Sequence, residues 1–331
     1  MAKAASIIIV NYNGGRYLSK LFDSIASQTF ADYEIFFVDN ASTDHSLKMI
    51  RARKDLPINI IKNSNNLGFC IANNQAVKLC TGKFLVFLNN DTYVDRNWLK
   101  RLIEKANTNS KNAIVVSSIL SPSGQGITEG PMQYDSYGAT IGLNKEHFFY
   151  GTGASILVKK DFLKNTDAFD SKLFMYQEDV DLCWRARIWG FNVAYEPKSL
   201  CYHLSESHGL FEDTLLMAPW KFYQSHCKNR IRILVKNYSK RSISKILPIA
   251  IFLIFARSLL MSIISKRYVY MQLFFKGVFW NLENLKDTLI ERGKIQLLRK
   301  VSDKEVLKYM LPYSIELVSI KPLMLNRKGL A

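Results

Sequence analysis

The sequence predicts an α/β fold in which helices cover both faces of a mostly parallel central sheet, followed by a basic helical C-terminal region. Three observations predict it. Short apolar runs alternate with helix-like stretches in the first half, polar residues follow most of these runs, and the charge balance changes abruptly near residue 220. With 331 residues, 48% of them hydrophobic, the chain can fill one large domain with an appendage, or two smaller domains.

The predicted strands are short runs rich in β-branched and aromatic residues, at 5–10, 33–38, 58–62, 84–89 and 113–118. Helical patterns lie between most of them, at 15–28, 42–54 and 69–80. Alternating strands and helices are typical of a parallel sheet that is buried on both faces. In such sheets the functional residues gather at the carboxyl ends of the strands.

The net charge of +17 is unevenly distributed along the chain. Residues 1–220 contain 23 Lys and Arg against 22 Asp and Glu, a balance of +1, whereas residues 221–331 contain 22 against 6, a balance of +16. We therefore predict two domains, 1–220 and 221–331. A strongly basic segment favours contact with nucleic acid or with an anionic membrane surface.

The cysteines and the N-terminus indicate a compartment. The five cysteines are odd in number and form no C-x-x-C pair, which argues against a disulfide framework and against a cysteine zinc site. We expect them to be reduced in an intracellular protein. The first apolar run is too short for a signal peptide.

Polar, turn-like residues follow four of the predicted strands, within 11–13, 39–44, 63–69 and 89–91. Asn and Asp are common in ordinary turns, but four such loops at one sheet edge favour a binding site. Asn89 and Asp91 are two residues apart, so they lie on the same side of an extended chain. Their oxygens suit a hard cation such as Mg²⁺ or Mn²⁺.

Glycine motifs for nucleotide binding are absent from the sequence. No G-x-G-x-x-G opens a helix after the first strand, and no G-x-x-x-x-G-K-[ST] occurs. The segment GTGASILV continues into an apolar strand and not into a helix. Dinucleotide-binding and P-loop folds are therefore disfavoured.

Three carboxylates are crowded at Glu178, Asp179 and Asp181, next to aromatic residues that favour burial. Acidic residues stabilise the first turn of a helix, and Asp181 can pair with Arg185 at i, i+4. That structural role competes with a catalytic one, because close carboxylates repel one another unless a cation, a proton or a substrate hydroxyl separates them.

Six segments occur in a fixed order: SIIIVNYNGGRYL, VDNASTD, NNLGF, LNNDT, GTGASILVKKDF and FDSKLFMYQEDVDLCWRARIWGF. Together they resemble the family 2 glycosyltransferases with the GT-A fold, most closely their rhamnosyltransferase-like branch. The resemblance covers residues 5–235. It implies transfer of a sugar from a nucleoside-diphosphate sugar to a hydroxyl group, with inversion at the anomeric carbon and with help from Mg²⁺ or Mn²⁺.

The resemblance also implies how the donor is held. Tyr12 and Asn13 would line the base, and Asp39 would accept the pyrimidine N3–H. Gly68, with Asn66 before it, would allow close approach of the backbone to the nucleotide. The remaining donor contacts fall at the D-x-D positions of the family, Asn89 and Asp91, where the asparagine leaves Asp91 as the main metal carboxylate.

The catalytic residues implied by the resemblance are Asp179 as the general base and Glu178 as a residue that orients acceptor or donor sugar. Asp181 and Arg185 are assigned to helix structure. His203 follows a predicted strand and is a candidate second metal ligand, since similar enzymes often have a histidine there. His208 is a weaker candidate.

The C-terminal region contains a predicted helix at 214–240 and two interrupted apolar segments at 247–264 and 268–285. Residues 247–264 are at the lower length limit for crossing a bilayer, and Arg257 lies within them. We expect peripheral attachment to an anionic membrane, with a single-pass or re-entrant segment left open. Packing of these helices in a homo-oligomer is the alternative.

The resemblance therefore implies an inverting, metal-dependent glycosyltransferase, which we expect at the cytoplasmic face of the cell membrane. Its donor would be dTDP-rhamnose or a UDP-sugar, and its acceptor a lipid-linked or cell-surface glycan. A catalytically silent sugar-nucleotide-binding or scaffold protein is the alternative, although such a protein is expected to lack Asp91 or Asp179. Nucleic acid is not expected as a partner, because the cations of the C-terminal region alternate with long apolar runs.

Overall fold

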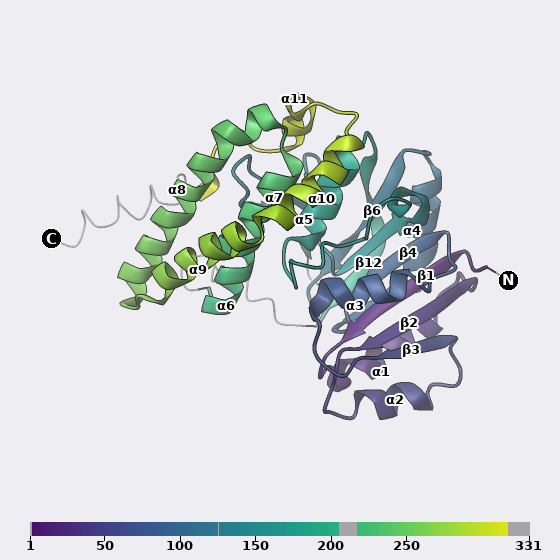
Figure 1. Cartoon of the computed structure of the whole chain (residues 1–331). Coiled ribbons are helices and arrows are strands. Elements are labelled where there is room, and N and C mark those ends of the chain that lie inside the picture. Colours follow the sequence, from purple (N-terminus) through teal and green to yellow (C-terminus); the bar gives the residue numbers. More distant parts are fainter. Residues whose placement is uncertain (1, 125, 205–216, 317–331) are drawn as a thin grey trace. The chain divides into compact units, whose positions relative to one another are not determined.

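The computed structural model describes residues 2–124, 126–204 and 217–316, which divide into two compact units (Figure 1). The first unit contains the chain up to Pro131 and resumes at Tyr150. The second unit contains Met132–Phe149 and the C-terminal helices. The α/β class with a helical C-terminal region is confirmed. The domain boundary at residue 220 stays a prediction, and no sequence signal had grouped residues 132–149 with the C-terminal helices.

The first unit is built on one large, mixed sheet. Its strands are β1 (Ala5–Asn11), β2 (Tyr33–Asp39), β3 (Ile58–Lys62), β4 (Phe84–Leu88), β5 (Thr92–Val94), β6 (Asn112–Leu120), β7 (Ile127–Glu129), β11 (Ser155–Lys159) and β12 (Asn192–His203). They are ordered β3-β2-β1-β4-β11-β6-β12-β5, and β7 pairs with β6. The five predicted strands are all present.

Parallel pairing joins β1 to β2 and β4, β2 to β3, and β12 to β6. The strand β11 is antiparallel to both of its neighbours, β4 and β6, and β5 is antiparallel to β12. The sheet is thus parallel over its first half and mixed over its second. Alternating β and α units gave no indication that an antiparallel strand lies in the middle of the sheet.

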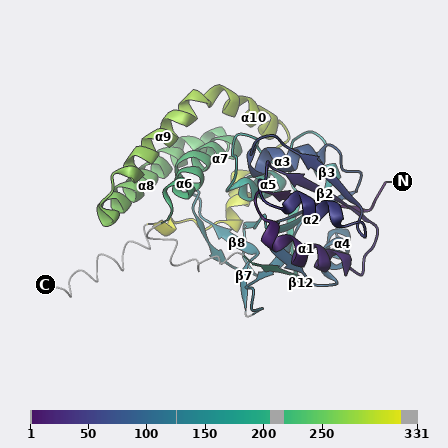
Figure 2. The same cartoon turned by 90° about the horizontal axis from the view of Figure 1, so that it is seen from below.

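Helices cover both faces of this sheet. They are α1 (Gly15–Ala26), α2 (Ser46–Ala52), α3 (Gly68–Val77), α4 (Trp98–Asn107) and α5 (Glu178–Ile188), with a 3₁₀ turn η1 (Lys160–Leu163). Figure 2 shows α1, α2 and α4 on one side of the strands and α3 on the other. One continuous core joins α1, α2 and α4 to the sheet face that carries Ile7 and Ile9. Ile8, between them in β1, is buried toward the opposite face.

The second unit combines a strand pair with a group of helices. Its elements are β8 (Pro131–Tyr134), β9 (Thr140–Leu143), α6 (Pro219–Phe222), the π-helical η3 (Tyr223–Asn229), α7 (Arg230–Asn237), α8 (Lys240–Ser265), α9 (Val269–Glu283), α10 (Leu285–Leu297), α11 (Asp303–Val306) and the 3₁₀ turn η4 (Leu307–Tyr309). β8 and β9 pair in antiparallel orientation. In the first unit, Tyr150–Gly151 form a short further strand, β10.

The predicted helix at 214–240 is divided in the structure. Residues 214–216 lie outside the described residues, and α6, η3 and α7 follow one another up to Asn237. Tyr238 then leaves the helical conformation, and its hydroxyl donates to the carbonyl of Ser136 at 2.8 Å. Ser239 caps α8, because its side chain accepts a hydrogen bond from the backbone N–H of Ser242 at 3.3 Å.

Buried charges hold parts of the second unit together. Arg230 makes a two-pronged ion pair with Glu316, at 2.9 and 3.1 Å, and both side chains are almost fully buried. Arg257, in the middle of α8, also reaches Glu316 at 3.3 Å. The charge of Arg230 outweighs the effect of burial and lowers the pKa of Glu316 to about 2. Arg257, which was predicted to interrupt the apolar segment, is thus paired with a buried carboxylate.

Close packing of α9 against η3 depends on a glycine. A Cβ atom at Gly277 would lie 2.6 Å from the carbonyl oxygen of Cys227, which is backbone and cannot rotate away. A Cβ atom at Gly293, in α10, would meet nothing within 4 Å. These two helical glycines therefore form a matched pair.

Gly277→Ala should destabilise the protein by about 1–3 kcal/mol, because the helices must move apart. Gly293→Ala should stabilise it by about 0.5–1 kcal/mol, because alanine loses less backbone entropy in a helix. Denaturant unfolding of both variants measures the difference. Equal effects of the two substitutions would contradict the described packing of α9.

Candidate active site

The carboxyl ends of β1, β2 and β4 bring the predicted donor-binding residues to one edge of the sheet. Asn11 and Asp39 are register partners at the ends of β1 and β2. Asn89 follows the end of β4, which pairs in parallel with β1 on the other side. In-register parallel strands must end at the same edge, so these side chains are neighbours although they lie far apart in sequence.

Asp39 is fully buried at this edge, and neither carboxylate oxygen has a hydrogen-bond partner among the described residues. Its backbone carbonyl accepts from the N–H of Asn63 at 2.9 Å. Burying a carboxylate without a donor is costly. A ligand that brings an N–H group would remove that cost.

A network of side-chain amides surrounds Asp39. The Nδ2 of Asn40 donates to Oδ1 of Asn66 at 2.8 Å, and Oδ1 of Asn40 accepts from Nδ2 of Asn63 at 3.1 Å. Oδ1 of Asn66 also accepts from the backbone N–H of Gly68 at 3.0 Å. Asn66 and Gly68 are thus tied directly to the end of β2, where they were expected to contribute to donor binding.

The loop after β1 is fixed by a second set of polar contacts. Asn13 has a left-handed backbone conformation, with φ of 52°, and its N–H donates to the hydroxyl of Ser42 at 3.0 Å. Asn11 donates to the same hydroxyl at 3.0 Å. Tyr12, between them, is 52% exposed at the site edge. A ring held in that position can stack on a base.

Asp91 and His203 form a pair at the end of the sheet. Oδ1 of Asp91 lies 3.1 Å from Nε2 of His203, and the antiparallel pairing of β5 with β12 places the two side by side. Burial lowers the pKa of His203, but the hydrogen bond and charge of Asp91 outweigh it and raise the pKa overall. Asn89 lies at the same turn, and its carbonyl accepts from the hydroxyl of Thr92 at 2.7 Å.

The chemistry of this pair suits a divalent cation, with one carboxylate and one imidazole as ligands. Within residues 2–124, 126–204 and 217–316, no cluster of three or more His, Cys, Asp or Glu side chains could hold a metal ion. The diphosphate of a donor would have to complete the coordination. The weaker candidate His208 lies outside the described residues.

The segment before α5 has a strained backbone. Phe174, Tyr176 and Gln177 have φ angles of 69°, 71° and 63°. Residues other than glycine rarely adopt this backbone conformation. Such strain is concentrated at functional sites, where surrounding contacts maintain it. The N–H of Cys70 donates to the carbonyl of Phe174 at 3.1 Å, and a Cβ at Gly68 would lie 2.4 Å from the Phe174 ring. The start of α3, at Gly68 and Cys70, therefore supports the strained segment.

Asp179 follows directly at the start of α5. One carboxylate oxygen accepts from the N–H of Gly153 at 3.0 Å, and the other from the N–H of Val180 at 2.8 Å. Burial raises the pKa of Asp179 to about 6, although these N–H groups favour its charged form. Burial, reinforced by the charge of Asp179, raises the pKa of Glu178 to about 8. At neutral pH the pair contains a base next to an acid.

Asp181 and Arg185 have the structural role that was predicted for them. Nε of Arg185 donates to Asp181 at 3.0 Å, both side chains are buried, and the guanidinium also binds the carbonyls of Asp167 and Ala168. The pair anchors the loop before α5 to the helix. Of the three crowded carboxylates, Asp181 is thus neutralised inside the fold.

Glu129, in β7, was not identified from the sequence. Its Oε1 lies 4.0 Å from Nδ1 of His203, and its charge contributes to raising the pKa of Asp179. The segment ITEG carries no motif or periodicity that distinguishes this glutamate from a surface residue. It becomes visible only when β7 pairs with β6 and the Glu129 side chain approaches His203.

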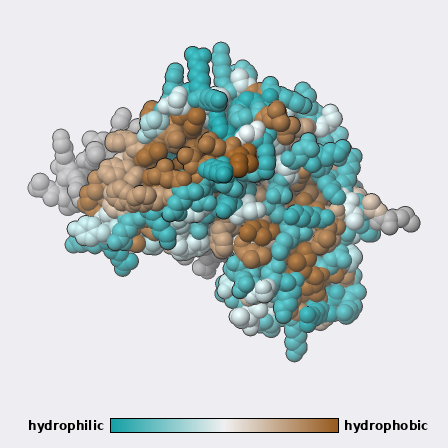
Figure 3. All heavy atoms as spheres, viewed as in Figure 1, coloured by the Kyte–Doolittle hydropathy of each residue, from teal (hydrophilic) through white to brown (hydrophobic). Residues whose placement is uncertain are grey.

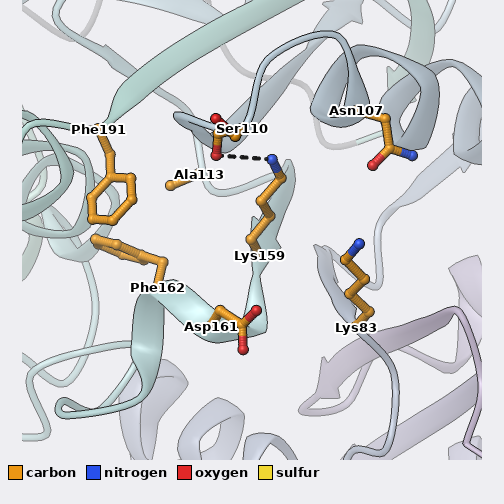
Figure 4. Close-up of a pocket in the computed structure, with 8 residues that line it drawn as sticks. All are labelled: Lys83, Asn107, Ser110, Ala113, Lys159, Asp161, Phe162 and Phe191. Atoms are coloured by element: carbon orange, nitrogen blue, oxygen red, sulfur yellow. Dashed lines mark hydrogen bonds between the residues drawn. The ribbon is translucent and has the colours of Figure 1, made fainter.

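A separate pocket of about 390 Å³ lies at the opposite edge of the same unit (Figure 4). Its lining residues come from the region before β4, the approach to β6, the end of β11 and the start of β12; they are Lys83, Asn107, Ser110, Ala113, Lys159, Asp161, Phe162 and Phe191. None of the predicted site residues lines it. The pocket is distinct from the candidate active site at the carboxyl ends of β1, β2 and β4, which we call the strand-end site.

Comparisons with known proteins agree with this architecture. A family model described as Glycosyl transferase family 2 matches residues 6–166. The poly(ribitol-phosphate) beta-N-acetylglucosaminyltransferase TarS of Staphylococcus aureus is 21% identical over 224 residues, which cover 66% of this chain and 38% of TarS. The poly-beta-1,6-N-acetyl-D-glucosamine synthase of Staphylococcus epidermidis is 24% identical over 206 residues, 60% of this chain and 49% of that protein.

Two solved structures show the same fold. The crystal structure of S. aureus TarS 1-349 matches with a TM-score of 0.52 and 17% identity, covering 92% of this chain and 83% of that one. GalNAc-T7 with UDP, GalNAc and Mn²⁺ matches with a TM-score of 0.60 and 15% identity, covering 85% of this chain and 57% of that one.

Residues 6–166 therefore resemble a family 2 glycosyltransferase domain, and the fold of the chain is GT-A. It spans 38% of the length of TarS, so the activity of that whole protein does not transfer directly. The rhamnosyltransferase-like branch stays a prediction, as do the roles of the individual site residues.

The raised pKa of Glu178 generates a test of the site that needs no substrate. The folded protein favours the neutral form of Glu178, so ionisation of this side chain destabilises the fold. The loss of stability is absent below the ordinary pKa of 4.5 and complete above about 8. Glu178→Gln should therefore gain stability relative to the unmodified protein as pH rises from 5 to 9. Denaturant unfolding across that range measures the gain.

Glu104→Gln is the matched control, because the Glu104 side chain is half exposed. Its effect should stay within about 0.5 kcal/mol at every pH. A Glu178→Gln difference that is independent of pH would show that Glu178 is solvated and not buried against Asp179.

Proposed function

We propose that the protein is an inverting glycosyltransferase that moves a sugar from a nucleoside-diphosphate sugar to a hydroxyl group of a glycan acceptor. The observation that carries this proposal is the buried carboxylate of Asp39, which has no hydrogen-bond donor among the described residues. The N3–H of uracil or thymine would supply one. Tyr12 and Asn13 border the same edge of the sheet and would contact the base.

Asp179 is suited to accept the proton of the acceptor hydroxyl. As the hydroxyl oxygen attacks the anomeric carbon, its proton passes to a carboxylate oxygen of Asp179, and the nucleoside diphosphate leaves from the opposite face. The N–H of Gly153 fixes the orientation of the carboxylate. Glu178 stays protonated at neutral pH because its pKa is raised, so it can donate a hydrogen bond to a sugar hydroxyl.

Asp91 and His203 would hold the divalent cation, Mg²⁺ or Mn²⁺. When bound, the cation neutralises charge that develops on the leaving diphosphate. Asn89 follows the same strand and would contact the sugar or ribose of the donor. Support comes from the 3.1 Å approach of Asp91 to His203 and from GalNAc-T7, whose structure contains Mn²⁺ with UDP.

The donor and acceptor are proposed at the level of class. The relatives' names describe transfer of N-acetylglucosamine to poly(ribitol-phosphate) and synthesis of an N-acetylglucosamine polymer. A UDP-sugar and dTDP-rhamnose are the first donors to test, and a lipid-linked or cell-surface glycan is the proposed acceptor class. Slow hydrolysis of one of these donors without acceptor would separate an enzyme from the alternative, a catalytically silent scaffold protein.

We also propose that the protein works at the inner face of the cell membrane, held there by the surface of α8, α9 and α10. Figure 3 shows an extended apolar area over α8 and α9. Many large apolar side chains of these helices are exposed: Ile249, Phe252, Leu259, Ile263, Ile264, Phe275, Phe279, Leu282, Leu285, Leu289, Ile290 and Leu297. An exposed apolar face of this kind marks an interaction surface.

α8 is long and apolar enough to cross a bilayer, but a third of its most apolar stretch is buried within the second unit. Ala250, Ile254 and Met261 pack inward, and Arg257 pairs with Glu316. Only one face of α8 is therefore available to lipid. This favours a helix that lies in the membrane interface over one that spans the bilayer.

Cations stand at both ends of α8. They are Lys240, Arg241 and Lys245 at its start and Lys266 and Arg267 at its end, and none makes an ion pair within the described part of the chain. Each would contribute about 1 kcal/mol at an anionic leaflet. A helix lying flat brings both groups to the same membrane surface.

Asp179→Asn should lower turnover by roughly 10²–10⁴-fold while donor affinity changes little, because the general base is lost and the nucleotide contacts remain. In the unmodified enzyme, turnover should fall as pH drops through about 6, since protonated Asp179 cannot accept the hydroxyl proton. Steady-state kinetics with saturating acceptor measure both effects. A variant that keeps more than a tenth of the activity would transfer the role to Glu178.

Liposome co-sedimentation tests the membrane surface. Phosphatidylserine-containing vesicles should bind the protein, and the double variant Phe252→Gln, Phe279→Gln should bind roughly 10–100-fold more weakly because two exposed rings no longer insert. Leu79→Gln, which changes an exposed apolar residue of the first unit, is the control. Binding that is unaffected by the double variant, or a stable dimer that the same variant dissociates, would contradict the proposal.

A further inference from the structure

The pocket at the edge opposite the strand-end site combines cations with an aromatic wall. Figure 4 shows the rings of Phe162 and Phe191 together on one side of the pocket, with Lys159 next and Lys83 beyond it. From this combination we propose a second binding site, for an anionic sugar unit of the acceptor glycan. Its role as an acceptor site rests on the proposed function, whereas the binding itself does not.

The charge of the pocket favours an anion. Within the described residues, neither Lys83 nor Lys159 forms an ion pair, and Asp161, the carboxylate among the lining residues, is not paired with either. Lys83 directly precedes β4, and Lys159 ends the adjacent strand β11, where it is the register partner of Phe84. Burial and the neighbouring charge of Lys83 lower the pKa of Lys159. A phosphate or carboxylate between them would relieve this repulsion.

Lys159 is pre-positioned for such a ligand. Its Nζ donates to the carbonyls of Asn109 and Ser110, at 3.1 and 3.2 Å, just beyond the end of α4. An ammonium group carries three donors, so one donor remains for a bound anion. Lys83 makes no hydrogen bond through its Nζ in the described chain, and it lies 5.5 Å from the ring centroid of Phe84.

The aromatic wall favours a sugar over a bare anion. Phe162 meets Phe191 edge to face at 5.5 Å and is backed by Trp189 at 5.2 Å, so its ring is held in place. The apolar C–H face of a pyranose can pack on such rings. The hydroxyls of the sugar would then face Asn107 and Asp161, which line the same pocket.

The size and position of the pocket define its role. A volume of about 390 Å³ accommodates a sugar phosphate or a short glycan segment. Since none of the proposed catalytic residues lines it, the pocket would tether a long acceptor and take no part in bond formation. Loss of the pocket should thus raise the KM for polymeric acceptor and leave donor hydrolysis unchanged.

Glucose 6-phosphate is the direct probe, with glucose and inorganic phosphate as partial probes, each titrated into the full chain by isothermal calorimetry or NMR. The sugar phosphate should bind more tightly than either partial probe. Lys83→Gln should weaken that binding at least fivefold, while Lys48→Gln, at an exposed lysine of α2, should leave it unchanged. Equal weakening by both variants, or no binding of glucose 6-phosphate, would overturn the site.

Two further outcomes are informative. Inorganic phosphate that binds as tightly as glucose 6-phosphate would refute the sugar component. Donor hydrolysis without acceptor is measured on the same Lys83→Gln sample. If the unmodified protein hydrolyses a donor but does not bind glucose 6-phosphate, the pocket proposal fails alone; if the unmodified protein binds the probe but hydrolyses none of the donors, the proposed function fails alone.

Discussion

The in-register parallel pairing of β1 with β2 is the constraint on which the candidate site depends. It runs without interruption from Ala5 opposite Tyr33 to Asn11 opposite Asp39, so both strands end at the same level. A slip of one residue would turn the apolar side chains of β1 to the wrong faces and would remove Asp39 from its buried position. Core packing and the position of the candidate site are thus fixed by the same backbone hydrogen bonds.

From that edge the contacts continue to the proposed general base. Asn40, directly after Asp39, binds Asn66, and Asn66 holds the N–H of Gly68. Gly68 lies against the ring of Phe174, in the strained segment that leads to Asp179. The strain of that segment costs on the order of 1–3 kcal/mol for each residue. Contacts of Gly68 and Cys70 with Phe174 offset this cost, so they link the two halves of the candidate site.

Residue types and spacing predicted the parallel half of the sheet, because each of its strands is a short apolar run that ends in a polar turn. Asp39, Asp91 and His203 were identified at the ends of predicted strands. Asp179 was identified among crowded carboxylates in a segment that resembles the family 2 glycosyltransferases. All four lie in the first unit. The position of Glu129, the strain at Phe174–Gln177 and the antiparallel β11 depend on tertiary pairing. No local pattern encodes them.

The helical unit shows the same limit. Composition revealed its charge and its apolar segments, but it could not show that Arg257 turns inward to Glu316 or that one face of α8 packs on the protein. Those contacts decide how much apolar surface is available to a membrane. They also show why hydropathy alone left crossing and lying flat as alternatives.

The central claim is that the Asp39 carboxylate accepts a hydrogen bond from the pyrimidine N3–H. Calorimetric binding of UDP and N3-methyl-UDP to the unmodified protein tests it most directly. A hydrogen bond to a charged acceptor contributes about 1.5–3 kcal/mol, so methylation should weaken binding by roughly 10–100-fold. The two nucleotides differ at the atom that Asp39 is proposed to contact. Equal affinity for UDP and N3-methyl-UDP would contradict the assignment.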